Sequence, residues 1–525
     1  MKMNIIFSLI LTLLIFNNVH ANGSEKAKLK DITFYPEQLE CNIKLTLKNL
    51  KQVGEVDERY QSFNLEMCEV VGGRFWIPYD ELDSTKIRGR GFDALKQSIP
   101  AINLYEKKLR VLTSALGPTY IRVSGLWANT IYFQDNDKPK LETAPEGYNN
   151  VLTRKQWKGV IDFVEAVDGK LTTSFTISDG IRDKDGNWTT AQIKPLINYT
   201  KSIGGEIAMA EMFNEPSHAS HGGAPKGYDG AWFDRDFAAF KSYMSSAMPE
   251  TKIAGPGSTG EGGIMPGISL TTDQIFEAEP KPNFDIWSYH YYGVLSKRCF
   301  GRQTPEDALT EEWLSKTELG LKYYEEFRDK YQPGIPIWLT ETAEASCGGN
   351  PLAATYVDCF RYLEQLGRLA KKNVKVVMHN TICASEYGLL EQETYEPKPN
   401  YWAALLWNKL MGTKAYEASL PVEGVDVFVH NLKNSSNGLA VMIVNPKNSE
   451  CSISIPAKAE QYLFTGDELQ PETVNELLTK TVKLNGKVLE LNPDETLPEL
   501  KGEKIKAGEV QLPPYSIVFL SFKNI

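Results

Sequence analysis

The sequence contains few of the residues from which metal, nucleotide and redox sites are built. It has six histidines and seven cysteines in 525 residues, and no two cysteines have the CxxC spacing of zinc and redox motifs. No glycine-rich turn of the dinucleotide-binding or P-loop type is present, since the nearest stretch, 255–263, has its glycines at the wrong spacing. We therefore expect neither a cofactor nor a metal site. Because seven is odd, at least one thiol stays unpaired, and the sequence does not say which cysteines pair.

An excess of positive charge is also absent. The 57 lysines and arginines stand against 67 aspartates and glutamates, which gives a formal net charge of −10. Binding to nucleic acid depends on neutralising phosphates with basic side chains, so nucleic acid is not an expected partner. The same balance argues against long, strongly sulfated polysaccharides as substrates.

The chain has no apolar run long enough for a transmembrane helix, which requires about 20 residues. A shorter run of mostly apolar residues, Ile5–Phe16, follows Lys2 and precedes the small-residue site Val19-His20-Ala21. This pattern is typical of a secretory signal peptide. We expect residues 1–21 to be removed and the mature chain, beginning near Asn22, to be secreted or periplasmic, without a membrane span.

Between residues 59 and 412, short apolar runs alternate regularly with longer amphipathic stretches. The stretches Phe92–Leu112 and Thr310–Tyr331 carry apolar residues at i, i+3 and i+4, which predicts helices. Eight strands that alternate with helices predict an α/β fold closed as a (β/α)8 TIM barrel. An open doubly wound sheet is the competitor, but it would need the glycine-rich phosphate turn that is missing. The eight predicted strands are Phe63–Met67, Tyr120–Ser124, Leu171–Ile177, Ile207–Phe213, Lys252–Ala254, Phe284–Tyr289, Ile335–Leu339 and Val374–Met378.

The character of the chain changes after Gly412. Short apolar runs separated by turns rich in Asn, Gly, Pro and Lys predict an all-β domain over residues 413–525, arranged as a β-sandwich. Two strand-like runs within residues 22–58, Ile32–Tyr35 and Ile43–Leu47, are expected to pack on this domain as added strands. The predicted C-terminal strands are Val425–His430, Gly438–Asn445, Cys451–Ile455, Tyr462–Thr465, Val482–Leu491 and Ser516–Phe522.

Barrel enzymes carry their chemistry at the C-terminal ends of the strands, so acidic residues at these ends are candidates for catalysis. The fourth run ends in Asn214-Glu215-Pro216 and the seventh in Thr340-Glu341-Thr342. Taken alone, the first motif is an ordinary helix start and the second an ordinary site for a salt bridge. Together the two glutamates suit glycoside hydrolysis, in which one carboxyl group protonates the leaving oxygen and the other attacks the anomeric carbon. Acids at the fourth and seventh strand ends are typical of the clan A retaining glycosidases, which this chain resembles.

Six further segments carry a narrower resemblance. They are Tyr120–Gly125, Trp338–Thr342, Cys347–Pro351, Val376–Leu389, Pro399–Trp402 and Leu410–Lys414. These segments are similar to the corresponding parts of the heparanase-like β-glucuronidases, glycoside hydrolase family 79. The resemblance covers residues 60–415 and is specific, because a generic clan A barrel lacks the Gly-Gly loop after the second glutamate.

The resemblance implies roles for four residues around the reacting bond. Glu215 would be the general acid/base and Glu341 the nucleophile. Asn214 would bond the 2-hydroxyl of the sugar, a contact that strengthens in the transition state. Tyr291, after the sixth strand, would orient the nucleophile.

The resemblance also implies a pocket for an acidic sugar. The backbone N–H groups of Gly348 and Gly349, with Tyr387, would bind the sugar carboxylate, because glycine allows close approach and amides pair well with a carboxylate. Glu66 stands where the family's heparanases carry a sugar-binding aspartate, and it would contact a sugar hydroxyl. Arg302 lies in a Gly-Arg pair that is similar to a cleft residue of the family.

The sequence therefore predicts a retaining glycoside hydrolase that cleaves β-linked glucuronic acid from glycans by a two-glutamate double displacement. Its expected partner is a glucuronic-acid-containing oligo- or polysaccharide, with terminal or lightly substituted glucuronic acid favoured over heparan sulfate. Two alternatives stay open at this point. One is a clan A glycosidase that acts on a neutral sugar, and the other is a glycan-binding protein without catalytic activity.

Overall fold

The computed structural model describes residues 42–525 except 83–90, 419–423, 469–470 and 524. The predicted signal peptide, residues 1–21, and the predicted strand Ile32–Tyr35 lie outside the described residues. None of the helices in the described ranges combines the length and the apolar character that a membrane crossing requires.

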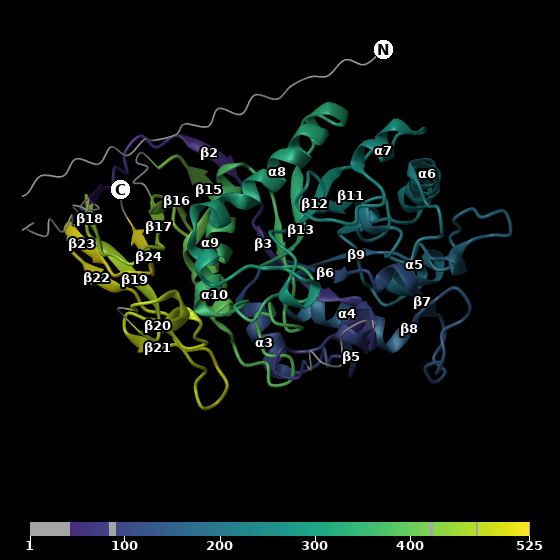
Figure 1. Ribbon diagram of the computed structural model, residues 1–525, viewed down its shortest axis with the longest axis horizontal. Coiled ribbons are helices and arrows are strands. Elements are labelled where there is room, and N and C mark those ends of the chain that lie inside the picture. Colours follow the sequence, from purple (N-terminus) through teal and green to yellow (C-terminus); the bar gives the residue numbers. More distant parts are fainter. Residues whose placement is uncertain (1–41, 83–90, 419–423, 469–470, 524) are drawn as a thin grey trace, which may run out of the picture. The chain divides into compact units, whose positions relative to one another are not determined.

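Eight parallel strands close into a barrel, as predicted (Figure 1). Each strand overlaps one of the eight predicted runs, and the barrel closes where β14 pairs with β3, with Val377 opposite Gln61. The prediction of a (β/α)8 barrel is therefore confirmed. In chain order the strands are β3 (Gln61–Glu66), β6 (Thr119–Ser124), β9 (Gly169–Ser174), β10 (Met209–Glu211), β11 (Lys252–Thr259), β12 (Ile286–Tyr292), β13 (Ile337–Ala343) and β14 (Val377–His379).

Helices follow the strands and surround the barrel (Figure 1). The predicted helix Thr310–Tyr331 is confirmed as α8, which begins after Thr310, whose side chain accepts a hydrogen bond from the N–H of Trp313. The helices that follow the eight strands are α3 (Lys107–Ala115), α4 (Arg154–Ala166), α5 (Ile193–Ser202), α6 (Gly230–Ala247), α7 (Thr272–Glu277), α8 (Glu311–Tyr331), α9 (Tyr356–Lys371) and α10 (Pro399–Leu410).

The predicted helix Phe92–Leu112 is wrong over most of its length. The chain there forms the short turn η1 (Phe92–Leu95) and strand β5 (Lys96–Ile99), which pairs with β4 (Gly73–Trp76), and α3 begins only at Lys107. Proline at position 100 explains the difference, because it lacks an N–H and disfavours helical backbone in the residue before it.

Side chains inside the barrel change from apolar to charged along the strands. Tyr120, Ile286 and Trp338 belong to one buried apolar cluster near the strand starts. Two residues further along β6, Arg122 faces the same interior, because side chains on a strand alternate between its two faces. The apolar layer closes one end of the barrel, so the buried charges gather at the C-terminal ends of the strands.

The C-terminal part forms a β-sandwich, as the fold prediction states. A nine-stranded sheet contains β2 (Gln52–Glu55), β15 (Met411–Tyr416), β16 (Asp426–Leu432), β17 (Leu439–Asn445), β19 (Ala459–Gly466), β20 (Val482–Leu484), β21 (Lys487–Val488), β22 (Glu503–Ile505) and β24 (Ser516–Phe522). A second sheet contains β1 (Asn42–Lys44), β18 (Cys451–Ile455) and β23 (Gly508–Leu512). Apolar side chains from both sheets, such as Ile43, Val441 and Ile453, share one buried cluster. The domain boundaries at residues 58/59 and 412/413 stay a prediction.

Candidate active site

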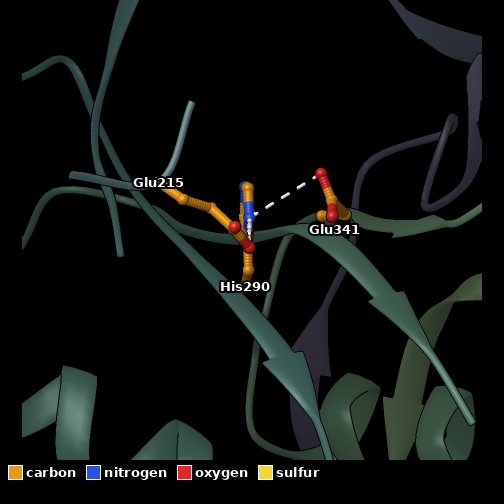
Figure 2. A group of neighbouring side chains, drawn as sticks. All are labelled: Glu215, His290 and Glu341. Atoms are coloured by element: carbon orange, nitrogen blue, oxygen red, sulfur yellow. Dashed lines mark hydrogen bonds and ion pairs between the residues drawn. The ribbon is translucent and has the colours of Figure 1, made fainter. Parts of the chain in front are cut away.

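The two predicted glutamates meet at the C-terminal mouth of the barrel. Glu215 lies four residues beyond the end of β10, and Glu341 lies within β13. Figure 2 shows both side chains turned toward the imidazole of His290 on β12. One carboxylate oxygen of each glutamate and a ring nitrogen of His290 all lie within 4.8 Å of one another. Glu215 adopts a positive φ of 50°, an uncommon conformation for a residue with a side chain and a frequent one at functional sites.

Arg122 on β6 is the cation at the centre of the site. Its Nη1 donates to Oε2 of Glu341 at 2.8 Å, and its Nη2 and Nε donate to Oε2 of Glu211 at 2.8 and 3.1 Å. The side chain is only 1% exposed. Burial alone would lower the pKa of Arg122, but the charges of Glu211 and Glu341 raise it above its ordinary value. A permanently charged guanidinium therefore stands beside the predicted nucleophile.

His290 has a defined proton position. Its Nε2 lies 3.2 Å from Nη2 of Arg122, which can only donate, so this nitrogen accepts and the ring proton is assigned to Nδ1. Burial, and then the charge of Arg122, hold the pKa of His290 well below 6.5, so the ring is neutral. The Nδ1–H donates to Oε1 of Glu215 at 3.0 Å. This bond occupies Oε1 and leaves Oε2 of Glu215 as the oxygen that can carry a proton.

The environment of Glu215 favours its protonated form. Burial raises the pKa of this carboxyl well above 4.5, and the charge of Glu341 raises it further. Arg122 opposes this shift, and Glu211 adds to it. Glu215 is thus a buried acid that keeps its proton to a higher pH than an ordinary glutamate.

Glu341 accepts a hydrogen bond at each of its two oxygens. Oε2 accepts from Arg122, and Oε1 accepts from the hydroxyl of Tyr292 at 2.7 Å. Tyr291, which the sequence analysis assigned to this role, is not at the nucleophile. Its ring lies on the outer face of β12 against α8, where a Cβ on Gly320 would come within 2.6 Å of it. Alternation along the strand explains the correction, because His290 and Tyr292 share the inner face and Tyr291 has the opposite one.

Asn214 lies beside the arginine, and one of its donors has no partner. Its Oδ1 accepts from Nη2 of Arg122 at 2.8 Å, while its Nδ2 is buried without a hydrogen bond. Asn129 fixes the backbone of Asn214 on both sides, donating to its carbonyl at 2.9 Å and accepting from its N–H at 2.8 Å. An unpaired buried donor is rare, and it leaves Asn214 able to bind a ligand hydroxyl.

Glu66, at the end of β3, joins the same cluster through Asn380. Nδ2 of Asn380 lies 3.0 Å from Oε1 of Glu66, 3.1 Å from the hydroxyl of Tyr292 and 3.3 Å from the hydroxyl of Tyr387. Oε2 of Glu66 has no partner. Burial, followed by the charge of Glu341, raises the pKa of Glu66 well above 4.5. The structure therefore brings Glu66 and Tyr387 to the nucleophile, although they are far apart in the sequence.

The Gly-Gly loop after β13 lies against Tyr387. Gly348 and Gly349 have φ angles of 82° and 83°, which favour glycine. A Cβ on Gly349 would lie 3.1 Å from the ring of Tyr387, and one on Gly348 would lie 2.7 Å from the ring of Trp76. Neither backbone N–H of the pair donates a hydrogen bond to any residue that the structure describes. The loop that packs against the ring of Tyr387 thus carries two amides without a hydrogen bond to the described residues.

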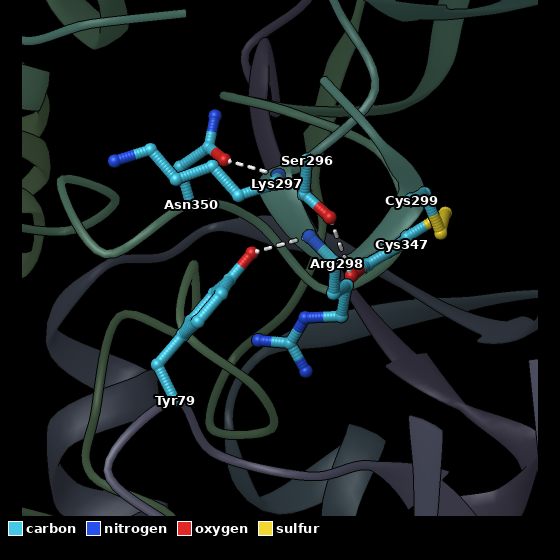
Figure 3. The surroundings of a disulfide bond; sticks show 7 residues. All are labelled: Tyr79, Ser296, Lys297, Arg298, Cys299, Cys347 and Asn350. Carbon is cyan, nitrogen blue, oxygen red and sulfur yellow. Dashed lines mark hydrogen bonds between the residues drawn. A yellow bond between two sulfur atoms is a disulfide. The ribbon is translucent and has the colours of Figure 1, made fainter. Parts of the chain in front are cut away.

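A disulfide ties this loop to the loop that follows β12. Cys299 and Cys347 are bonded, with their Cα atoms 6.4 Å apart (Figure 3). Beside the disulfide, the N–H of Lys297 donates to Oδ1 of Asn350 at 2.7 Å, and Oγ of Ser296 donates to the carbonyl of Cys347 at 3.2 Å. These contacts hold the backbone of the Gly-Gly loop in a defined position.

Arg302, like Tyr291, is a predicted site residue that the structure does not bring into this network. It is exposed, and it makes no hydrogen bond or ion pair with the part of the chain that the structure describes. Arg298, in the same loop, is buried instead. Its guanidinium lies 4.2 Å from the ring centre of Tyr79 and donates to Glu386 at 3.3 Å. A cation near the Gly-Gly loop therefore exists, but it is held by the protein itself.

Glu215, His290 and Glu341 are also the one described group whose spacing could hold a metal ion. The guanidinium of Arg122 already binds Oε2 of Glu341 and Nε2 of His290. A metal ion bound there would face this buried positive charge at close range. Hydrogen bonds within the protein are therefore sufficient to account for the cluster.

Several important residues were not singled out from the sequence. Arg122 could have been suspected, because it is a charged residue in the middle of an apolar strand run. His290 and Tyr292 could have been found by following the alternation along β12 from the buried Ile286. The sequence offers no comparable signal for Asn380, whose role depends on contacts across the barrel.

A closed parallel barrel with two buried glutamates at the ends of its fourth and seventh strands defines a glycoside hydrolase of clan A. Solved structures agree on the fold. A 4-O-α-L-rhamnosyl-β-D-glucuronidase from Fusarium oxysporum superposes with a TM-score of 0.62 at 11% identity, over 91% of this chain and all of the other. A family 51 α-L-arabinofuranosidase from Thermotoga petrophila gives 0.59 at 14% identity, over 92% and 99%.

Comparison with curated sequences narrows the class. Mouse heparanase is 27% identical over 470 residues, which cover 79% of this chain and 86% of the heparanase. Baicalin-β-D-glucuronidase from Scutellaria baicalensis is 33% identical over 268 residues, or 49% of each chain. Mouse inactive heparanase-2 is 24% identical over 400 residues, 72% of this chain and 65% of the relative. No family model matches the chain. The predicted resemblance to the heparanase-like β-glucuronidases of glycoside hydrolase family 79 is confirmed by these similarities, and the chain is a glycoside hydrolase.

Proposed function

We propose that this protein is a retaining hydrolase that cleaves β-linked glucuronic acid from glycans. The observation that carries the proposal is the pair of buried carboxylates within 4.8 Å of each other, in environments that separate their roles. In retaining glycosidases the two carboxyl groups lie about 5–5.5 Å apart, too close to admit a water for direct inversion. Glu215 keeps its proton, while both oxygens of Glu341 accept hydrogen bonds.

The proposed reaction has two steps. In the first, Glu341 attacks the anomeric carbon, and Oε2 of Glu215 gives its proton to the departing glycosidic oxygen, so that a covalent glycosyl-enzyme forms. In the second, the Glu215 carboxylate takes a proton from water, the water oxygen bonds to the anomeric carbon, and the bond to Glu341 breaks. Two displacements retain the β configuration. Asn214 would donate its unpaired Nδ2–H to the 2-hydroxyl, and His290 would hold Glu215 in place.

The proposed specificity for a uronic acid rests on three free donors. The N–H groups of Gly348 and Gly349 have no partner among the described residues, and the hydroxyl of Tyr387 accepts from Asn380 and can still donate its own proton. Three neutral donors on two neighbouring segments suit a carboxylate. The names of two similar proteins, a baicalin-β-D-glucuronidase and a rhamnosyl-β-D-glucuronidase, support the same sugar.

We further propose that the protein is exported, with residues 1–21 as its signal peptide. The disulfide between Cys299 and Cys347 supports this proposal, because such bonds persist in oxidising compartments.

The test compares 4-nitrophenyl β-glucuronide with the matching β-glucoside and β-galactoside. We expect release from the glucuronide alone, with the β anomer of glucuronic acid appearing first by NMR. Glu341→Gln should abolish turnover with the melting temperature unchanged. Tyr387→Phe should weaken hydrolysis of the glucuronide only. Release from a neutral glycoside would overturn the carboxylate pocket, and saturable binding without turnover would favour a glycan-binding protein.

A further inference from the structure

A buried lysine contacts the loop that carries Tyr387. Lys398 immediately precedes α10, and only 5% of it is exposed. Lysine is rarely buried, and a cation is disfavoured at the N-terminus of a helix, where the helix dipole is positive. Within the described residues the Lys398 side chain makes no capping hydrogen bond to α10. Neither core packing nor helix capping therefore explains why a lysine occupies this position.

The ammonium group of Lys398 binds the backbone just before Tyr387. Its Nζ donates to the carbonyl of Ser385 at 3.3 Å and to that of Glu386 at 3.2 Å. The next carbonyl, that of Tyr387, accepts from Nε2 of His379 at 2.9 Å. Burial lowers the pKa of His379 to about 4, so this ring is neutral and carries its proton on Nε2. Two buried side chains thus hold three consecutive carbonyls of the loop.

The same loop segment is joined to the Gly-Gly loop. Ser385 adopts a φ of 67°, a left-handed conformation that is costly for a residue with a side chain and must be stabilised by contacts around it. Its Oγ donates to the carbonyl of Gly348 at 2.8 Å, and the N–H of Glu386 donates to the same carbonyl at 3.2 Å. A shift of residues 385 and 386 would therefore displace Tyr387 and Gly348 together.

Glu391 supplies the counter-charge of Lys398. Its Oε2 lies 3.6 Å from Nζ of Lys398, and its Oε1 lies 2.7 Å from Nζ of Lys480, which comes from the β-sandwich. Burial lowers the pKa of Lys398, and the charge of Glu391 raises it. The side chain of Lys480 is 66% exposed. Two lysines thus share one carboxylate, but the buried one also binds the carbonyls of the loop.

We propose that Lys398 is a positioning residue of the uronic acid pocket, which holds residues 385–387 so that Tyr387 and the Gly-Gly loop bind the sugar carboxylate together. Hydrogen bonds from a charged donor are stronger than those between neutral groups, so one ammonium can fix two carbonyls of an irregular loop. The proposal rests on the proposed function and deepens it. Lys398 would set the affinity for glucuronic acid without touching the sugar.

The test compares three variants with wild type on 4-nitrophenyl β-glucuronide, with melting temperatures as a check on folding. Lys398→Met removes the charge and both carbonyl contacts and keeps an unbranched apolar chain. Lys398→Gln keeps a neutral N–H donor on a side chain that is one atom shorter. Lys480→Met is the matched control, because it removes the other cation from Glu391 and leaves the carbonyls of the loop untouched.

We expect Lys398→Met to raise KM about tenfold, while kcat stays within about twofold of wild type. The sugar carboxylate takes no part in bond breaking, so its contacts stabilise the bound substrate and the transition state nearly equally. Lys398→Gln should raise KM by a smaller factor, about threefold, because a neutral donor forms weaker hydrogen bonds. Lys480→Met should leave both constants within about twofold of wild type, as expected for an exposed ion pair.

A double-mutant cycle identifies the contact through which Lys398 acts. Tyr387→Phe removes the hydroxyl that the loop brings to the sugar. In that background Lys398→Met should raise KM by no more than about threefold, because the main contact that the lysine positions is already lost. An equal factor in both backgrounds would mean that Lys398 acts independently of Tyr387, which overturns the inference.

The remaining outcomes separate this inference from the function beneath it. A wild-type enzyme that cleaves no glucuronide would overturn the proposed function, and the inference with it. An active wild type with an unchanged KM in Lys398→Met would overturn the inference alone, as would a loss confined to kcat or a rise in KM that Lys480→Met shares. If neither Lys398 variant folds, the lysine supports the fold as a whole, and its assignment to the pocket is overturned.

Discussion

Adjacent tyrosines on β12 give the sharpest test of the catalytic arrangement. Replacing Tyr292 by Phe removes the hydroxyl that donates to Oε1 of Glu341 at 2.7 Å and leaves the ring in place. Replacing Tyr291 by Phe is the matched control, since it removes an identical hydroxyl from the outer face of the same strand. The two variants therefore differ only in whether the hydroxyl is removed from the inner or the outer face of β12.

The expected loss can be worked from the contact. A hydrogen bond to a charged group contributes about 1.5–3 kcal/mol. The Tyr292 bond is fully buried, and it orients the attacking carboxylate, so we assign this whole range to the transition state. The corresponding decrease in kcat/KM is roughly 10- to 150-fold. Tyr291→Phe should stay within about twofold of wild type, because its ring packs against α8 and its hydroxyl has no role at Glu341.

The assay is the initial rate on 4-nitrophenyl β-glucuronide over a range of substrate concentrations, with melting temperatures as a check on folding. Activity of Tyr292→Phe within twofold of wild type would refute the assigned contact. A larger loss in Tyr291→Phe than in Tyr292→Phe would refute the placement of the two faces of β12.

Three further perturbations test the acid, a buried carboxyl and the disulfide. Glu215→Gln should severely slow the hydrolysis of natural glycans but spare the first step for substrates with good leaving groups. In the wild type kcat/KM should decline at high pH, where Glu215 with its raised pKa loses its proton, and this decline should be absent from the pH profile of the variant. Asp234 is buried without partners, and burial raises its pKa to about 7. The pKa of Asp234 is higher in the folded than in the unfolded chain, so its contribution to stability is lost as the pH rises from about 4 toward 7. At pH 8 the free energy of unfolding of Asp234→Asn should exceed that of wild type by about 1–2 kcal/mol after screening, and at pH 4 the two should be equal in a denaturant titration. Serine at both Cys299 and Cys347 should raise KM for the glucuronide more than it lowers kcat, and an unchanged KM would contradict the role of the disulfide in holding the Gly-Gly loop.

The barrel could be predicted because its evidence is local. Each strand is a short apolar run, each helix an amphipathic stretch, and eight such units close in only a few ways. The same argument predicted that Glu215 and Glu341 lie at one mouth of the barrel, because the C-terminal ends of parallel strands meet there regardless of the loop conformations. It failed at Phe92–Leu112, where helical spacing was read across a proline and pairing with β4 decided the outcome.

The sequence by itself determined the class of protein and where its two glutamates belong, because periodicity and strand ends are properties of neighbouring residues. Tertiary structure alone decided the details of the site. Choosing Tyr292 over Tyr291 requires the face of β12, and pairing Cys299 with Cys347 requires the distance between two loops. The proton on Nδ1 of His290 depends on Arg122, which arrives from another strand 168 residues away in the sequence. Such contacts depend on the geometry across the barrel, which the pattern of residues along the sequence does not specify.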